Sequence, residues 1–149
     1  YLIQALIQPF ISLAFIPLIL ESSTVSLSWP IIILSVIAMF AILGESIADI
    51  QLYQSKKEAK TTLYQKGLWK FSRHPNYFFD ILFWLSLSSY TFLLTKNIIS
   101  FCSPILLYVI MKFITGKISE KLSLKKHGID YSAYQKTTPM IIPIKLFIK

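Results

Sequence analysis

The chain has 149 residues, of which 54% are hydrophobic and 15% are charged, and its net charge is +8. With a mean hydropathy of +0.60, it is too apolar for a soluble domain of this size, so we expect an integral membrane protein. The positive charge suits anionic lipid headgroups, and no basic stripe interleaved with aromatic residues favours nucleic acid as a partner. The single cysteine, Cys102, excludes a disulfide framework and a cysteine-based metal site, and we expect no metal.

Four apolar segments approach or reach the roughly 20 residues that a helix needs to cross a bilayer. None shows the strict alternation of a transmembrane strand, so we predict helices. In chain order, the predicted spans cover residues 2–20, 29–48, 78–94 and 98–114. The sequence therefore predicts an all-α, polytopic membrane protein with about four transmembrane helices in a single membrane domain, residues 1–149.

The first predicted span begins the chain. It follows Tyr1 rather than an initiator methionine, so we expect further residues upstream. Because it has no basic leader and contains Pro9 and Pro17, we predict a kinked transmembrane helix rather than a secretory signal.

Basic residues distinguish the two sides of the predicted bundle. Residues 49–77 carry six bases and the tail, residues 115–149, carries seven lysines, whereas the loops on the opposite side contain only Lys96. The positive-inside rule therefore places the loop 49–77 and the C-terminal tail in the cytoplasm.

Arg73 is the only arginine among the 15 basic residues, and it stands just before Pro75 and the third apolar segment. Proline suits the first turn of a helix, whose free N–H groups and positive dipole end attract anions. Because an arginine fork can hold two phosphate oxygens at once, we predict a site for a phosphate-bearing ligand here. The alternative is that Arg73 is only a topological anchor.

Three carboxylates lie within or beside the predicted spans. Glu45 and Asp49 share a helix face because they are four residues apart, and Asp80 follows about one turn into the third helix. We expect them to converge near Arg73 and His74, where they would neutralise the arginine, orient a ribose or transfer a proton. Alternatively, Glu45 and Asp49 pair with loop lysines, and Asp80 is a favourable first-turn acid.

The tail is predicted to contain an amphipathic cytoplasmic helix. Residues 116–127 continue out of the fourth span, and Gly128 is a typical helix stop. In the turn that follows, Tyr131 and Tyr134 lie three residues apart on one side, as ligand contacts or as interfacial anchors. Residues 140–148 form an apolar strip suited to the membrane interface.

Three blocks of sequence resemble one known family. They are Ala48-Asp49-Ile50-Gln51, then KGLWKFSRHPNYF from Lys66 to Phe78, then Glu120 with Gly128, Tyr131, Tyr134-Gln135, Thr137 and Ile142-Pro143. In order and spacing, from about residue 30 to the C-terminus, they resemble the steroid 5-alpha-reductase-like C-terminal domain family, domain of unknown function 1295. The shorter Arg-His-Pro-x-Tyr core also resembles isoprenylcysteine carboxyl methyltransferases, phospholipid methyltransferases and sterol reductases.

The resemblance implies a membrane enzyme that uses NADPH to reduce a double bond in a hydrophobic lipid or steroid-like substrate. The residues it implies for the cofactor pocket are Asp49, Arg73, His74, Asn76, Tyr77, Asp80, Tyr131, Tyr134 and Lys136. The candidates for catalysis are Glu45, His74 and Asp80. The alternatives are a methyltransferase that uses S-adenosylmethionine, and a non-catalytic or truncated membrane protein of the same fold.

The chain departs from the family pattern at two places. Phe79 stands where relatives commonly have glycine, and we expect its ring to obstruct close approach of a cofactor to the backbone. Thr115-Gly116-Lys117 replaces the usual Ser-Gly-Ile. Relatives also have additional N-terminal helices, which we expect upstream of Tyr1.

Overall fold

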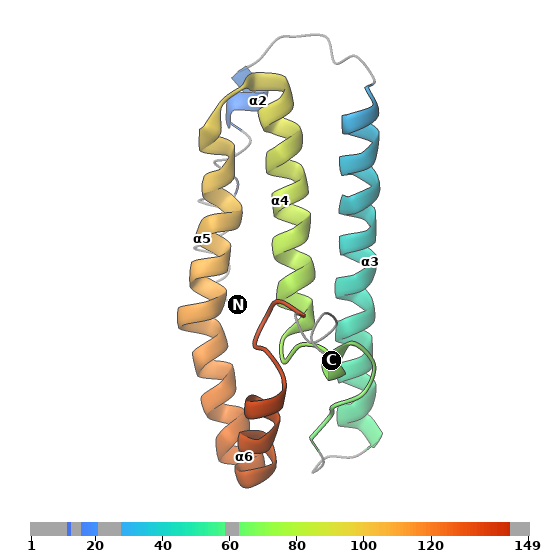
Figure 1. The fold of residues 1–149 in the computed structure, drawn as a ribbon, viewed down its shortest axis with the longest axis vertical. Coiled ribbons are helices and arrows are strands. Elements are labelled where there is room, and N and C mark those ends of the chain that lie inside the picture. Colours follow the sequence, from blue (N-terminus) through green and yellow to red (C-terminus); the bar gives the residue numbers. More distant parts are fainter. Residues whose placement is uncertain (1–11, 13–15, 21–27, 59–62, 144–149) are drawn as a thin grey trace. The chain divides into compact units, whose positions relative to one another are not determined.

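The structure, a computed structural model, describes Ser12 and residues 16–20, 28–58 and 63–143. Every regular element within these ranges is a helix, as predicted (Figure 1). The described residues belong to two compact units. Unit 1 lies within Tyr1–Ala41 and Ile81–Val109, and unit 2 lies within Ile42–Asp80 and Ile110–Lys149.

Within the described part of the chain, three helices are long and apolar enough to cross a membrane, and two of them are α3 (Trp29–Glu58) and α4 (Pro75–Thr95). They contain the predicted segments 29–48 and 78–94. Pro75 is the first residue of α4, as predicted, because a proline at that position sacrifices no helical hydrogen bond. The helix α3 continues past its apolar part because its polar last turns contain good helix formers such as Lys56 and Lys57.

The third of these helices, Ile98–Thr137, consists of four successive elements. They are the 3₁₀-helix η3 (Ile98–Phe101), α5 (Cys102–Ile110), the π-helix η4 (Met111–Thr115) and α6 (Gly116–Thr137). The predicted segment 98–114 is therefore helical throughout, but its last turn is wider than an α-turn. A Cβ at Gly116 would overlap with the carbonyl oxygen of Met111, so the missing side chain lets the π-turn rejoin the α-helix.

The helix α6 consists of two arms that meet at Gly128, where φ is 54° and ψ is −121°. In a straight helix, Glu120 and Gln135 would lie about 22 Å apart. Instead, Gln135 Nε2 donates a hydrogen bond of 2.9 Å to Glu120 Oε2. The second arm therefore turns back beside the first (Figure 1), and the predicted helix stop at Gly128 is confirmed.

Two predicted segments lie partly or largely outside the described residues. Of the predicted span 2–20, the structure describes Ser12 and the helix α2 (Ile16–Leu20). Of the predicted interfacial strip 140–148, it describes only the start. There Ile141 is buried within unit 2, so the prediction of a membrane-facing strip is wrong at this residue.

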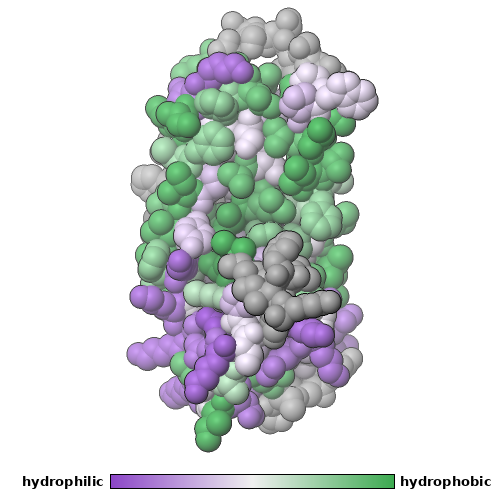
Figure 2. Space-filling view, viewed as in Figure 1, coloured by the Kyte–Doolittle hydropathy of each residue, from purple (hydrophilic) through white to green (hydrophobic). Residues whose placement is uncertain are grey.

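Large apolar side chains remain exposed along the candidate membrane helices. On α3 they recur every three or four residues, at Ile33, Val36, Phe40, Leu43 and Ile47, and thus share one face. In Figure 2, apolar side chains cover α5, whereas hydrophilic side chains gather around α6. Exposed apolar faces of this extent are unfavourable in water and suit lipid, so the structure indicates a membrane-embedded protein.

Candidate functional site

The segment that contains the Arg73 motif, residues 66–78, is attached to α3 through the 3₁₀-helix η2 (Gly67–Lys70). Trp69 Nε1 donates a hydrogen bond of 3.0 Å to the carbonyl oxygen of Ala48. The backbone N–H of Leu68 donates one of 3.0 Å to Gln51 Oε1. These two bonds give a physical reason for the paired sequence blocks, because residues 48–51 hold the segment that leads to Arg73.

The second arm of α6 fixes the same segment through Tyr134, which is only 3% exposed. Its hydroxyl lies within hydrogen-bonding distance of the backbone carbonyl oxygens of Trp69 and Ser72. Tyr131 packs edge-on against the Tyr134 ring, with centroids 6.0 Å apart. Both tyrosines therefore face the interior of unit 2 and are not surface anchors.

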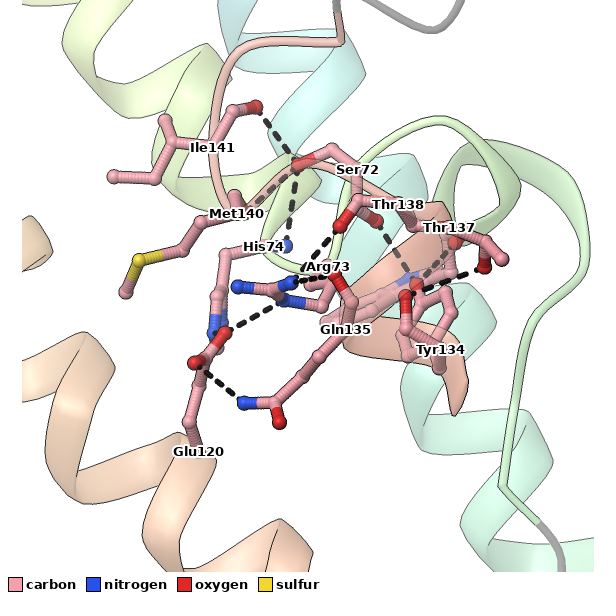
Figure 3. Close-up of polar contacts among 11 residues, drawn as sticks. Ser72, Arg73, His74, Glu120, Tyr134, Gln135, Thr137, Thr138, Met140 and Ile141 are labelled. Carbon is pink, nitrogen blue, oxygen red and sulfur yellow. Dashed lines mark hydrogen bonds and ion pairs between the residues drawn. The ribbon is translucent and has the colours of Figure 1, made fainter. Parts of the chain in front are cut away.

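Arg73 connects both arms of α6 to Thr138, the residue that follows this helix (Figure 3). Its Nε donates to Glu120 Oε1 at 2.7 Å, and its Nη1 donates to the carbonyl oxygens of Gln135 and Thr138 at 2.8 and 2.9 Å. The side chain is 11% exposed. Arg73 is thus more than a topological anchor, because charge-assisted hydrogen bonds of this kind stabilise the fold. The third guanidinium nitrogen, Nη2, takes no part in these three bonds.

His74 precedes α4, and its ring stacks on Tyr77 with centroids 4.9 Å apart. Its Nε2 is buried without a hydrogen-bond partner among the described residues. The nearby Glu120 Oε1 lies at 3.7 Å, which is too long for a hydrogen bond. Because buried polar atoms are nearly always paired, this nitrogen is a candidate ligand contact.

Asn76, in the first turn of α4, also has a polar atom without a hydrogen-bond partner among the described residues. Its Nδ2 donates a hydrogen bond of 3.1 Å to Asp49 Oδ1, so two of the residues predicted for the cofactor pocket are in contact. Its Oδ1 is buried, and no described residue donates to it. The amide therefore offers an acceptor to a ligand.

These side chains surround a partly open cavity of about 240 Å³ in unit 2. Its walls carry the cations Lys56, Arg73 and Lys126 together with His74 and His127, and no described aspartate or glutamate lines it. Most of the other polar residues of the wall are tyrosines and serines. The cavity is therefore suited to an anionic ligand with several hydrogen-bonding groups.

The structure brings together most of the residues predicted to hold a cofactor. Those that line the cavity are Arg73, His74, Asn76, Tyr77, Tyr131 and Tyr134. Asp49 is bonded to the wall residue Asn76 but does not line the cavity itself, and neither do Asp80 and the exposed Lys136.

The three predicted carboxylates form a separate group. Glu45 is half-buried on α3 and lies close enough to Asp49 and Asp80 to experience the charge of both. None of the three belongs to the cavity wall. The three carboxylates therefore lie near one another, as expected, but they do not line the cavity together with His74 and Arg73.

Several wall residues were not anticipated from the sequence. The first arm of α6 contributes Ser119, Ser123, Lys126 and His127. Their spacing of three or four residues places them on one helix face, and this polar pattern is the sequence signal that could have identified them. Lys56, considered only as a charge of the cytoplasmic loop, lines the cavity from α3.

Phe79 does not obstruct this cavity. The residue is 7% exposed and is not part of the cavity wall. Its ring packs against Gly44 of α3, where any Cβ would overlap with the ring carbons. The glycine on α3 thus provides the space for this aromatic ring of α4.

The family described as Protein of unknown function (DUF1295) matches residues 1–138 of the chain. No curated protein and no solved structure matches it. The matched region includes the Ala48–Gln51 block, the Arg73 motif and both arms of α6, and the motif and both arms contribute residues to the cavity wall. The chain is therefore a member of the DUF1295 family.

Proposed function

We propose that the protein is a membrane-embedded reductase that uses NADPH to reduce a double bond in a hydrophobic lipid or steroid-like substrate. The cavity of unit 2 is the cofactor site in this proposal. When bound, the reduced nicotinamide supplies a hydride to the substrate double bond. The observation that carries the proposal is a wall with three cations and two histidines but no described carboxylate.

The charges of the wall fit a dinucleotide phosphate. Glu120 partly neutralises Arg73, so Lys56 and Lys126 are the main source of attraction for phosphate groups. Arg73 holds both arms of α6 in place and presents Nη2 as a further donor. Lysine and arginine are the side chains that most commonly bind phosphate, as a point charge and as a planar fork respectively.

The two unpaired polar atoms fit the non-ionic part of the same ligand. Asn76 Oδ1 accepts a hydrogen bond from a ribose hydroxyl or a carboxamide, and its amide is oriented by Asp49. Tyr77, stacked on His74, offers an aromatic face and a hydroxyl. Among the candidates for catalysis, His74 is the one in the cavity wall, and we propose that its Nε2 holds a proton for the substrate.

We further propose the topology. The protein crosses the membrane about four times, with α6 outside the bilayer and with the loop 49–77 and the tail 115–149 in the cytoplasm. The excess of lysine in these two regions supports this orientation. In this orientation, a nucleotide enters the cavity from the cytoplasm, where nucleotides are dissolved.

A titration with NADPH tests the proposed function. We expect NADPH to raise the melting temperature of the detergent-solubilised protein and to bind Lys126→Gln about 3- to 10-fold more weakly, the effect of losing one partly hydrated charge contact. Lys125→Gln is the matched control, because Lys125 is an exposed neighbour on α6 that does not line the cavity. Lys56→Gln and Lys57→Gln form a second matched pair on α3.

S-adenosylmethionine provides the discriminating comparison. It carries two cationic groups and one carboxylate, and no described carboxylate of the wall would pair with those cations. Stabilisation by S-adenosylmethionine alone would replace the reductase proposal with the methyltransferase alternative. Binding of neither compound would support a non-catalytic member of the family.

A further inference from the structure

The segment Thr138–Ile141, here called the strap, follows the second arm of α6. Thr138 has an extended backbone, with φ −134° and ψ 127°, as expected for a residue before proline. Three successive carbonyl groups of the strap then face residues 71–74, here called the motif loop, and Figure 3 shows those of Met140 and Ile141 beside Ser72. Pro139 O accepts from Arg73 N–H and Met140 O accepts from His74 N–H, both at 2.9 Å, and Ile141 O accepts from Ser72 Oγ at 2.7 Å.

Ser72 is at the centre of this contact and is only 1% exposed. Its hydroxyl lies 2.7 Å from Ile141 O and 3.1 Å from Met140 O, and it accepts from the backbone N–H of His74 at 3.2 Å. A serine hydroxyl has one hydrogen to donate and two lone pairs. One buried side chain therefore connects the strap to the backbone of His74.

The strap is also anchored at its side chains. Thr138 and Ile141 are 3% and 4% exposed. The Met140 methyl group lies where a Cβ of Gly116 would be, so the missing side chain at the junction of η4 and α6 accommodates it. The strap is thus fixed to α6 on one side and to the motif loop on the other.

We propose that Ser72 is a positioning residue and that the strap backbone is the template that holds Arg73 and His74 in the cavity wall. This inference rests on the proposed function for the identity of the ligand, but its geometry does not. Pro139, Met140 and Ile141 lie beyond the region matched by the family, which ends at residue 138. In this proposal, nucleotide binding therefore depends on the backbone of these three residues.

Hydrogen exchange of the protein without added nucleotide tests the template directly. We expect the amides of Arg73 and His74 to exchange at least about 10-fold faster in Ser72→Ala than in the wild type, because their acceptors are no longer held in place. Met140→Ala, which removes the anchor but leaves every hydrogen-bonding group, should have the same effect. This second variant decides the question if Ser72→Ala does not fold.

Ser86→Ala is the matched control. Ser86 is 4% exposed, and its hydroxyl bonds to Leu82 O of its own helix at 2.8 Å. We expect this variant to leave exchange at Arg73 and His74 unchanged. Equal exchange at these two amides in the wild type and Met140→Ala would overturn the template.

A double-mutant cycle with NADPH then tests whether Ser72 acts through Arg73. We expect the losses in affinity caused by Ser72→Ala and Arg73→Lys to be non-additive by at least about threefold, because the two residues share one network. Additive losses would indicate a merely structural role and overturn the positioning assignment. Failure of the wild type to bind NADPH would refute the proposed function, whereas hydrogen exchange would still decide the template.

Discussion

Replacement of Arg73 by lysine keeps the charge and removes the planar fork. The guanidinium makes three hydrogen bonds of 2.7 to 2.9 Å through two of its nitrogens. A lysine Nζ is a single point at the end of a flexible chain, so we expect it to retain the bond to Glu120 and to lose those to the carbonyl groups of Gln135 and Thr138. Each hydrogen bond to a charged group contributes about 1.5–3 kcal/mol.

The expected loss of stability is therefore about 3 kcal/mol. We take the lower end of the range for the two lost bonds because the side chains of Arg73 and Glu120 remain 11% and 14% exposed, so water can partly replace them. For a chain of this size, 1 kcal/mol corresponds to a shift of about 2–4 °C in melting temperature, so Arg73→Lys should melt about 6–12 °C lower.

The assay is thermal unfolding in detergent without nucleotide, at one scan rate for all variants because such unfolding is often irreversible. Lys66→Arg is the control, since Lys66 is exposed and its side chain makes no capping bond to η2. It should melt within about 1 °C of the wild type. A melting temperature of Arg73→Lys within about 2 °C of the wild type would refute the argument that the fork stabilises unit 2.

Two further substitutions test the packing around the site. Tyr134→Phe should lower the free energy of unfolding by about 1–2 kcal/mol, because two buried carbonyl oxygens lose their hydroxyl partner. Thermal unfolding measures this loss. Tyr53→Phe is the control, because Tyr53 is 70% exposed. Gly44→Ala should cost about 1–3 kcal/mol, because its Cβ overlaps with the Phe79 ring, and Phe79→Leu in the same chain should recover part of the loss. Full stability of Gly44→Ala by itself would show that the ring does not pack there.

The helical elements were accessible from the sequence because local chemistry decides them. Pro75 begins α4 and Gly128 interrupts α6, each for a backbone reason that holds in any tertiary context. The apolar runs predicted the membrane helices, and the family blocks predicted six of the residues in the cavity wall. The π-turn η4 was not predicted, because no residue in it distinguishes a π-turn from an α-turn.

The partners of Arg73 were inaccessible for a different reason. The sequence predicted that Arg73 binds a phosphate-bearing ligand and indicated no partner at Glu120. In the structure Arg73 donates a hydrogen bond to Glu120, 47 positions further along the chain. Glu120 lies on the first arm of α6, which continues from the π-turn, and the fold-back at Gly128 brings the carbonyl groups of Gln135 and Thr138 to the same guanidinium. Its partner therefore depends on the direction of a helix axis, which residue spacing does not encode.

What the sequence alone determined is the set of local preferences. It determined an all-helical chain, apolar enough for lipid, with a basic and aromatic motif at the start of one helix. Only the tertiary structure decided that the strap holds this motif, that lysines from two helices line the same cavity, and that the carboxylates of Glu45, Asp49 and Asp80 stay out of its wall. Periodicity fixes the face on which a side chain lies, but the burial and hydrogen bonding that create a site arise only when distant segments pack together.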